Sequence, residues 1–155
     1  MTDVNQGSSD QSDEVSDEEV AEAMRMLADG FIEGSDADGF PHFTWDVADA
    51  ARLDAICDAL RVRDDPQGDG WHGRIMTMGA YLGELLVRHG NGHWSYDSTN
   101  KAAVVIMPNG LAAYPHNKVA KRLEIGPEHS LSAFFDYSLS RHVPPGGQVR
   151  TMRDQ

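Results

Sequence analysis

Apolar residues recur at three- and four-residue spacing between Trp71 and Gly90, the pattern of one long helix that buries a wide face. Two glycines, Gly79 and Gly83, lie on a neighbouring face of this helix. A glycine in a helix interior costs about 1 kcal/mol relative to alanine, so we expect the pair to let another backbone pack closely. The recurring apolar positions are Ile75, Met78, Leu82, Leu85 and Leu86.

Two further helices are expected before this one. Ser16 and Glu19 have the spacing of a capping box, which predicts a helix start, and Gly30 and Gly34 would end that helix. From Thr44 the pattern is helical again, with Thr44 as the candidate N-cap. In this second helix the periodicity places Val47, Ala50, Leu53, Ile56, Cys57 and Leu60 inward, and Asp46, Asp49, Asp54, Asp58 and Arg61 outward.

Three short apolar runs follow the long helix, at residues 93–96, 102–107 and 111–114. Asn109 and Gly110 between the last two runs are a strong hairpin signal, and the short connections favour an antiparallel meander. The unbroken run at 102–106 predicts a central strand. Two more helices are expected, one at 117–124 and one with Pro127 at its first position. The sequence therefore predicts an α+β fold: a three-stranded antiparallel sheet packed by four to five helices, in the order α-α-α-β-β-β-α-α.

The net charge of −12 is concentrated at one end of the chain. Residues 1–38 hold 12 of the 25 acidic residues and one of the 13 basic ones, a net charge of −11, whereas the rest carries −1. We expect a disordered acidic tail at 1–15, a single α+β domain at 16–143 and a frayed segment at 144–155. Lys118, Lys121 and Arg122 would form a modest exposed basic face for binding. Another protein, possibly basic, is the expected partner, and nucleic acid is not.

Cys57 is the only cysteine, so the chain can form no internal disulfide and no zinc site that needs two thiolates. Its place on the apolar face of a helix predicts a small buried residue rather than a nucleophile. No apolar leader or membrane span is evident. We therefore expect a cytoplasmic protein with no membrane association, no metal and no cofactor.

Several short motifs resemble those of a family of small bacterial domains of unknown function, often actinobacterial. They are Gly79-Ala80-Tyr81-Leu82-Gly83-Glu84, a following glycine and tryptophan in Gly92-His93-Trp94, and Lys121-Arg122-Leu123-Glu124 after Pro115. The resemblance covers roughly residues 40 to 140. It implies an α+β domain and no particular activity.

Three side chains are candidates for chemistry. Glu84 lies among leucines, a setting suited to acid–base work, although Arg88 four residues on could pair with it instead. His89 and His93 have the spacing of two ligands on a helix, but the glycines between them break that helix. The favoured hypothesis is a non-catalytic protein-binding module, such as an adaptor, accessory or immunity-like inhibitor protein. One alternative is a small hydrolase-like enzyme using Glu84 with a nearby histidine, and another is an export-linked small secreted protein.

Overall fold

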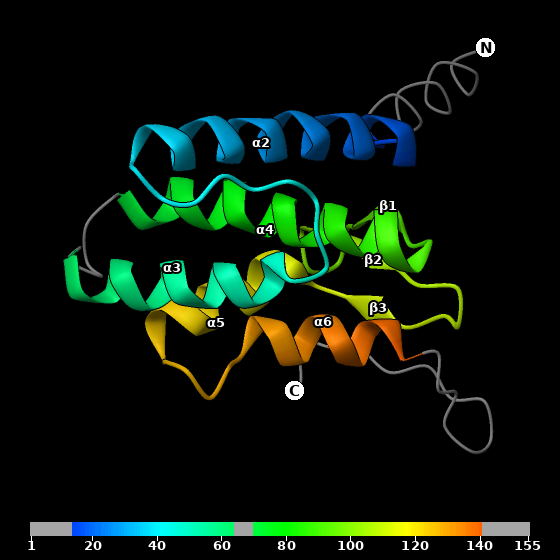
Figure 1. Cartoon of the computed structure of the whole chain (residues 1–155). Helices are drawn as coiled ribbons and strands as arrows, with labels where there is room; N and C mark the ends of the chain where they lie inside the picture. Colours follow the sequence, from blue (N-terminus) through cyan, green and yellow to red (C-terminus); the bar gives the residue numbers. More distant parts are fainter. Residues whose placement is uncertain (1–13, 64–69, 141–155) are drawn as a thin grey trace, which may run out of the picture.

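The computed structural model describes residues 14–63 and 70–140, which form five helices and one sheet (Figure 1). The predicted α+β fold and its element order are confirmed. The expectations for residues 1–13 and 144–155 lie outside the described residues. Within the described ranges, no helix is long and apolar enough to cross a membrane. In chain order the elements are α2 (Asp17–Ala37), α3 (Asp49–Arg63), α4 (Gly70–Gly90), β1 (His93–Asp97), β2 (Ala102–Ile106), β3 (Ala112–Ala113), α5 (Pro115–Glu124) and α6 (Leu131–Leu139).

Helix α4 is the centre of the molecule. Every residue from Met78 to Leu86 is buried, so this stretch contacts other elements on all sides. Gly79 lets another backbone approach, as expected, because an added Cβ would lie 2.8 Å from the His116 Cα atom. At Gly83 the close neighbour is a side chain instead, and an added Cβ would lie 2.2 Å from the Trp94 ring. The two glycines thus bring α5 and β1 against α4.

The sheet has the order β1-β2-β3 and both pairings are antiparallel, which confirms the meander and the central position of β2. The Asn109-Gly110 turn joins β2 to β3, with Gly110 at φ 90°. Trp94 lies opposite Val105, and Tyr96 lies opposite Ala103, so these four side chains share one face. Trp94 and Val105 are buried in the core, whereas Tyr96 is 39% exposed. One end of this face is therefore covered and the other is open.

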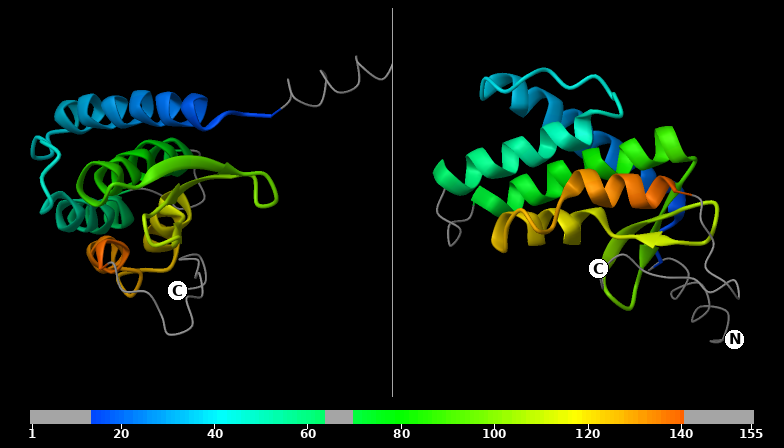
Figure 2. Two further views of the ribbon diagram at one scale, coloured as in Figure 1. Left: turned by 90° about the vertical axis from the view of Figure 1, so that its right-hand side faces the viewer. Right: turned by 60° about the horizontal axis from the view of Figure 1, so that its bottom comes forward.

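Helix α2 lies across the top of the molecule, and the β1–β2 hairpin runs beneath its start (Figure 2). The predicted capping box is present. The predicted end at Gly30 and Gly34 is wrong, because the helix continues to Ala37. Beyond these glycines Ser35 is buried, at 4% exposure, and Phe31 between them is buried too. Burial of this face outweighs the glycine penalty, which is about 1 kcal/mol for each residue.

The predicted start of the second helix is also wrong. Helix α3 begins at Asp49 rather than after Thr44, because Trp45 has a φ of 66° and the helix cannot pass through it. Val47, predicted inward, is 54% exposed, and Asp49, predicted outward, is fully buried. The local pattern misassigned both residues because they precede or start the helix and do not follow its periodicity.

Candidate binding groove

A groove opens between α2 and the β1–β2 hairpin, and we call it the α2–hairpin groove. Its volume is about 560 Å³, compared with about 70 Å³ for a hollow beside Gly30 and Gly34 and about 180 Å³ for one beside Leu139. Pockets of a few hundred Å³ or more can accept a ligand or several side chains. The groove is lined by Val15, Glu19, Val20, Ala23, Met24, Met76, Tyr96, Lys101, Ala102, Ala103 and His116.

His116 of α5 is the polar side chain at the inner side of the groove. Its Nε2 atom lies 3.1 Å from the carbonyl oxygen of Met76, and since a carbonyl can only accept, Nε2 carries the proton. Burial lowers the pKa of His116 to about 4. The imidazole is therefore neutral at physiological pH and adds no cation to the groove. Gly79 makes room for the ring, because an added Cβ there would lie 2.4 Å from the His116 Cδ2 atom.

The α2 side of the groove is acidic and its carboxylates are fixed in place. Glu19 accepts a hydrogen bond from the Ser16 backbone at 3.0 Å, and this bond, together with the Ser16 side chain, lowers the pKa of Glu19. Asp17 accepts a hydrogen bond from the Ser95 hydroxyl at 2.9 Å, which joins the first turn of α2 to β1. Two acidic side chains are therefore held in place at the start of α2, and Glu19 is the one that lines the groove.

The opposite rim is the turn of the β1–β2 hairpin, which carries Lys101 at a φ of 54°. Asp97 organises this turn by accepting hydrogen bonds from the backbone of Thr99 and from Asn100, and a further one from the Tyr114 hydroxyl. These contacts, that of the Asn100 side chain first, lower the pKa of Asp97 to about 2. The turn is thereby held in one shape by an ionised carboxylate.

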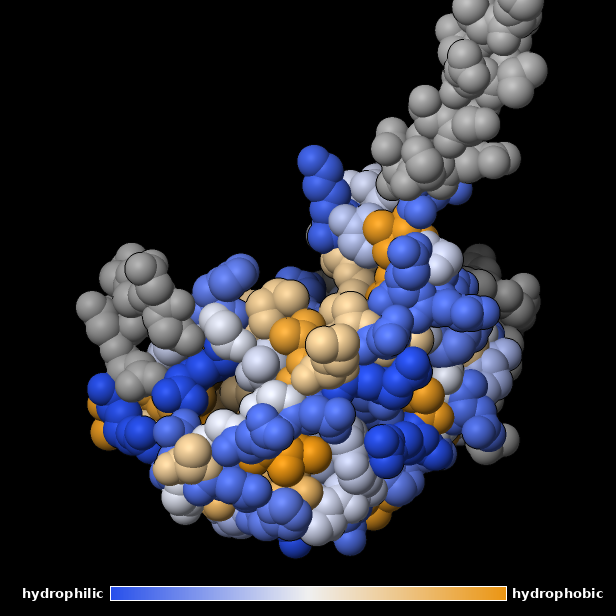
Figure 3. Space-filling view, turned by 90° about the horizontal axis from the view of Figure 1, so that it is seen from above, coloured by the Kyte–Doolittle hydropathy of each residue, from blue (hydrophilic) through white to orange (hydrophobic). Residues whose placement is uncertain are grey.

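The view down on α2 shows how the surface is divided (Figure 3). Apolar side chains gather in a patch near the middle of this face, and hydrophilic side chains surround them. Two apolar residues that line the groove, Val15 and Tyr96, are 49% and 39% exposed. The apolar lining thus continues outward to the solvent.

Glu84 does not line this groove. It is 3% exposed and accepts a hydrogen bond from the Trp94 indole at 2.8 Å. The Arg88 Nε atom lies 3.8 Å from its other oxygen, which is the helical pair expected from the sequence. The carboxylate therefore ties α4 to β1.

The two candidate histidines have different surroundings. His89 is exposed and its Nε2 lies 2.7 Å from the carbonyl oxygen of Trp45. His93 is exposed at the first position of β1, beyond the end of α4. Among the described residues, no group of three or more histidine, cysteine, aspartate or glutamate side chains could hold a metal ion.

The expected basic face of Lys118, Lys121 and Arg122 is not formed as an exposed surface. Lys118 is 8% exposed and Arg122 is 3% exposed, so the prediction that both face solvent is wrong. Burial lowers the pKa of Lys118. The helical pattern could not reveal that Arg122 has acidic partners on another helix.

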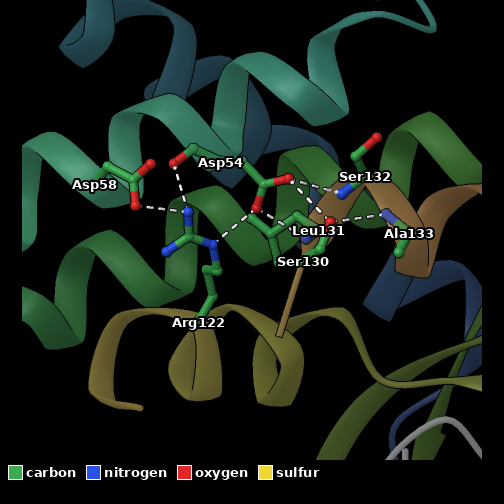
Figure 4. A network of polar contacts seen from close by, with 7 residues as sticks. All are labelled: Asp54, Asp58, Arg122, Ser130, Leu131, Ser132 and Ala133. Carbon is green, nitrogen blue, oxygen red and sulfur yellow. Dashed lines mark hydrogen bonds and ion pairs between the residues drawn. The ribbon is translucent and has the colours of Figure 1, made fainter. Parts of the chain in front are cut away.

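Arg122 lies in a polar network between α5, α3 and the start of α6 (Figure 4). Its guanidinium donates to Asp54 at 2.9 Å and to Asp58 at 2.7 Å. Asp54 in turn accepts hydrogen bonds from the backbone of Leu131 at 2.8 Å and of Ser132 at 3.0 Å. Helix α6 therefore starts at Leu131, four residues later than predicted, and is capped by Asp54 of α3 together with Ser130.

A second polar cluster, which sequence reasoning missed, surrounds Trp45. The indole is stacked on Tyr81 at 4.3 Å, and the Arg88 guanidinium lies 3.8 Å from the indole centroid. The Tyr81 hydroxyl donates to Asp49 at 2.6 Å and accepts from the Trp45 backbone at 2.9 Å. Burial, with the bond to Asp49, raises the pKa of Tyr81, so its hydroxyl keeps the proton that it donates. These contacts hold Trp45 in its unusual backbone conformation.

Cys57 is fully buried, as expected. Burial raises the pKa of its thiol to about 12, despite the opposing charge of Arg122. A thiol in this state is a poor nucleophile at neutral pH.

Comparison of the chain with protein-family models, with characterised proteins and with solved structures gave no match. The resemblance to small bacterial domains therefore stays a prediction.

Proposed function

We propose that this protein is a non-catalytic protein-binding module of the cytoplasm, an adaptor, accessory or immunity-like inhibitor protein. The partner, another protein, inserts apolar side chains into the α2–hairpin groove. The observation that carries the proposal is the groove itself: about 560 Å³ in volume, lined mainly by alkyl and aromatic side chains, and formed by helices and strands that are already in place.

The rim of the groove favours a protein over a small molecule as the occupant. Val15 and Tyr96 leave large apolar surfaces in water at the mouth. A small molecule inside the groove would cover only the parts of these side chains that line it, whereas a protein surface laid across the mouth would also cover the parts that face solvent. Met24 and Met76 in the lining can adjust their shape to side chains of a partner.

The contacts of the candidate catalytic residues support a binding role. Glu84 receives the Trp94 indole and lies near Arg88, and His89 contacts the Trp45 backbone. His116 lines the groove, but its Nε2–H is bonded to Met76. Among the described residues of the groove, Glu19 is the one carboxylate, and it accepts a hydrogen bond from the Ser16 backbone. The proposed cytoplasmic location rests on the single cysteine, which allows no internal disulfide and so favours a reducing compartment.

Blocking the groove tests this function. Ala23 is exposed on α2 and lines the groove, so Ala23→Phe places a ring in the groove without entering the core. Ala55 is exposed on α3 and does not line the groove, so Ala55→Phe is the matched control. Circular dichroism first establishes that both variants are folded.

A partner is captured from the native host on the immobilised full chain, identified, purified and titrated against each variant. We expect equal affinity for the wild type and Ala55→Phe, and a loss of about tenfold or more for Ala23→Phe. Equal binding by all three proteins would show that the groove is not the binding site.

A further inference from the structure

We propose that the groove accepts a basic amphipathic segment of the partner. An apolar anchor would lie on Met76, Tyr96 and Ala103, and a lysine or arginine beside it would pair with Glu19. This inference rests on the proposed function and specifies the chemistry of the partner.

The charges around the groove favour a basic occupant. From Glu14 to Arg25 the chain carries five acidic residues and one basic residue, Arg25, all of them exposed, and Glu19 is the acid that lines the groove. Lys101 is the one cation among the lining residues, and it lies on the opposite rim. The mouth is thus negative on the α2 side, which attracts a cationic segment and orients it with its basic side chains toward α2.

The acidic rim is also preorganised. The bonds from Ser16 to Glu19 and from Ser95 to Asp17 hold both carboxylates in position before a partner arrives. Fixed carboxylates lose little side-chain freedom when they pair with a cation, so less of the pairing energy is lost to ordering. Apolar burial in the groove would supply affinity, and the rim would supply charge selectivity.

The same charges disfavour other occupants. A second copy of the chain docked symmetrically would bring two acidic α2 starts together. An acidic peptide would meet the same repulsion. Residues 141–155 of this chain are the other basic candidate, with three arginines and one aspartate, and the experiment below includes them.

Three synthetic peptides of equal length serve as probes. The first is amphipathic and contains leucine and lysine, the second has glutamate in place of each lysine, and the third has serine in place of each leucine. Each is titrated into the full-length protein by calorimetry at low and at physiological salt. We expect binding of the first peptide alone, weaker at the higher salt.

Four variants locate the binding. Glu19→Gln keeps the capping-box residue type but removes the charge, and we expect about fivefold weaker binding. Glu33→Gln neutralises an exposed acid of α2 that does not line the groove, and should bind as the wild type does. Ala23→Phe should abolish binding, and Ala55→Phe should not change it.

Each remaining result would overturn the inference. Equal affinity for the acidic peptide, or unchanged affinity in Glu19→Gln, would contradict the charge selectivity. If no peptide binds, but Ala23→Phe still weakens binding of the captured partner, then the proposed chemistry of the partner is wrong and the proposed function stands. Self-association that Ala23→Phe abolishes would identify a second copy as the occupant. About tenfold tighter peptide binding after combined Arg150→Glu and Arg153→Glu substitution would identify the C-terminal segment instead.

Discussion

Replacing Asp54 with alanine is expected to destabilise the protein more than replacing Asp58, the other acidic partner of Arg122. The substitution removes the acceptor for the Arg122 Nε–H and for the backbone N–H groups of Leu131 and Ser132. It therefore breaks a buried ion pair and a helix cap together. Arg122, with a side chain only 3% exposed, would keep Asp58 as its remaining acidic partner.

The magnitude follows from these contacts. Loss of a helix N-cap costs about 1 kcal/mol, and removing one partner of a buried ion pair costs about 3–5 kcal/mol. The Asp54 side chain is 19% exposed and Asp58 remains, so the lower end applies. We expect a loss of about 3 kcal/mol in the free energy of unfolding, a large part of the roughly 5–15 kcal/mol of a typical domain.

Urea unfolding followed by circular dichroism measures this change. With an m-value of about 2 kcal/mol/M, the midpoint should fall by about 1.5 M. Asp58→Asn is the matched control, because Asp58 is 61% exposed, and it should cost about 0.5 kcal/mol. Amide exchange at Leu131 and Ser132 should accelerate in Asp54→Ala alone. A loss below about 1 kcal/mol, or equal losses in both variants, would refute the proposed role of Asp54.

Three further predictions concern single side chains. Gly83→Ala should lower the free energy of unfolding by about 2 kcal/mol or more, because the added Cβ would lie 2.2 Å from the Trp94 ring. Gly30→Ala, where an added Cβ has no atom within 4 Å, should raise it by about 0.5–1 kcal/mol. Melting temperatures that shift in the same direction for both variants would contradict this prediction. The pKa of His116 is lowered from 6.5 to about 4, so between these pH values the unfolded chain binds more protons than the folded protein. The free energy of unfolding should therefore fall as the pH drops from 6.5 toward 4, by at most about 3 kcal/mol. His116→Gln should flatten this pH dependence in urea titrations, and an unchanged slope would contradict the prediction. The Cys57 thiol, with its pKa raised to about 12, should resist a disulfide reagent at pH 8 in the native protein and react after unfolding, and rapid native labelling would show that it is accessible.

The sequence was sufficient for the elements whose signals are local. The capping box at Ser16 and Glu19 and the turn at Asn109-Gly110 each depend on residues close in the chain, and both are present in the structure. The long apolar period of α4 was equally informative, because burial on all sides needs apolar residues all round. Such signals predicted the fold class and the order of the elements.

The burial of Asp49 and Arg122 was not predicted, because each has a partner far along the chain that a local pattern does not reveal. Asp49 is fully buried with the hydroxyl of Tyr81, 32 residues away, as a donor, and Arg122 is buried against Asp54, 68 residues away. A periodic pattern assigns any charged residue to the outer face, which holds only when no partner offsets the cost of removing it from water. The solvent exposure predicted for Arg122 in the basic face was wrong for this reason.

The groove has a local cause that is visible only when the sheet register is known. Along the shared face of β1 and β2, the pair Trp94 and Val105 fills the space above the sheet, and the next pair, Tyr96 and Ala103, does not. Protein interiors are close-packed, so a small residue opposite another small residue leaves a hollow unless a neighbour fills it. Ala23 of α2, which also lines the groove, is small as well. Two alanines on different elements therefore leave room in the groove, and a large side chain at either position should narrow it.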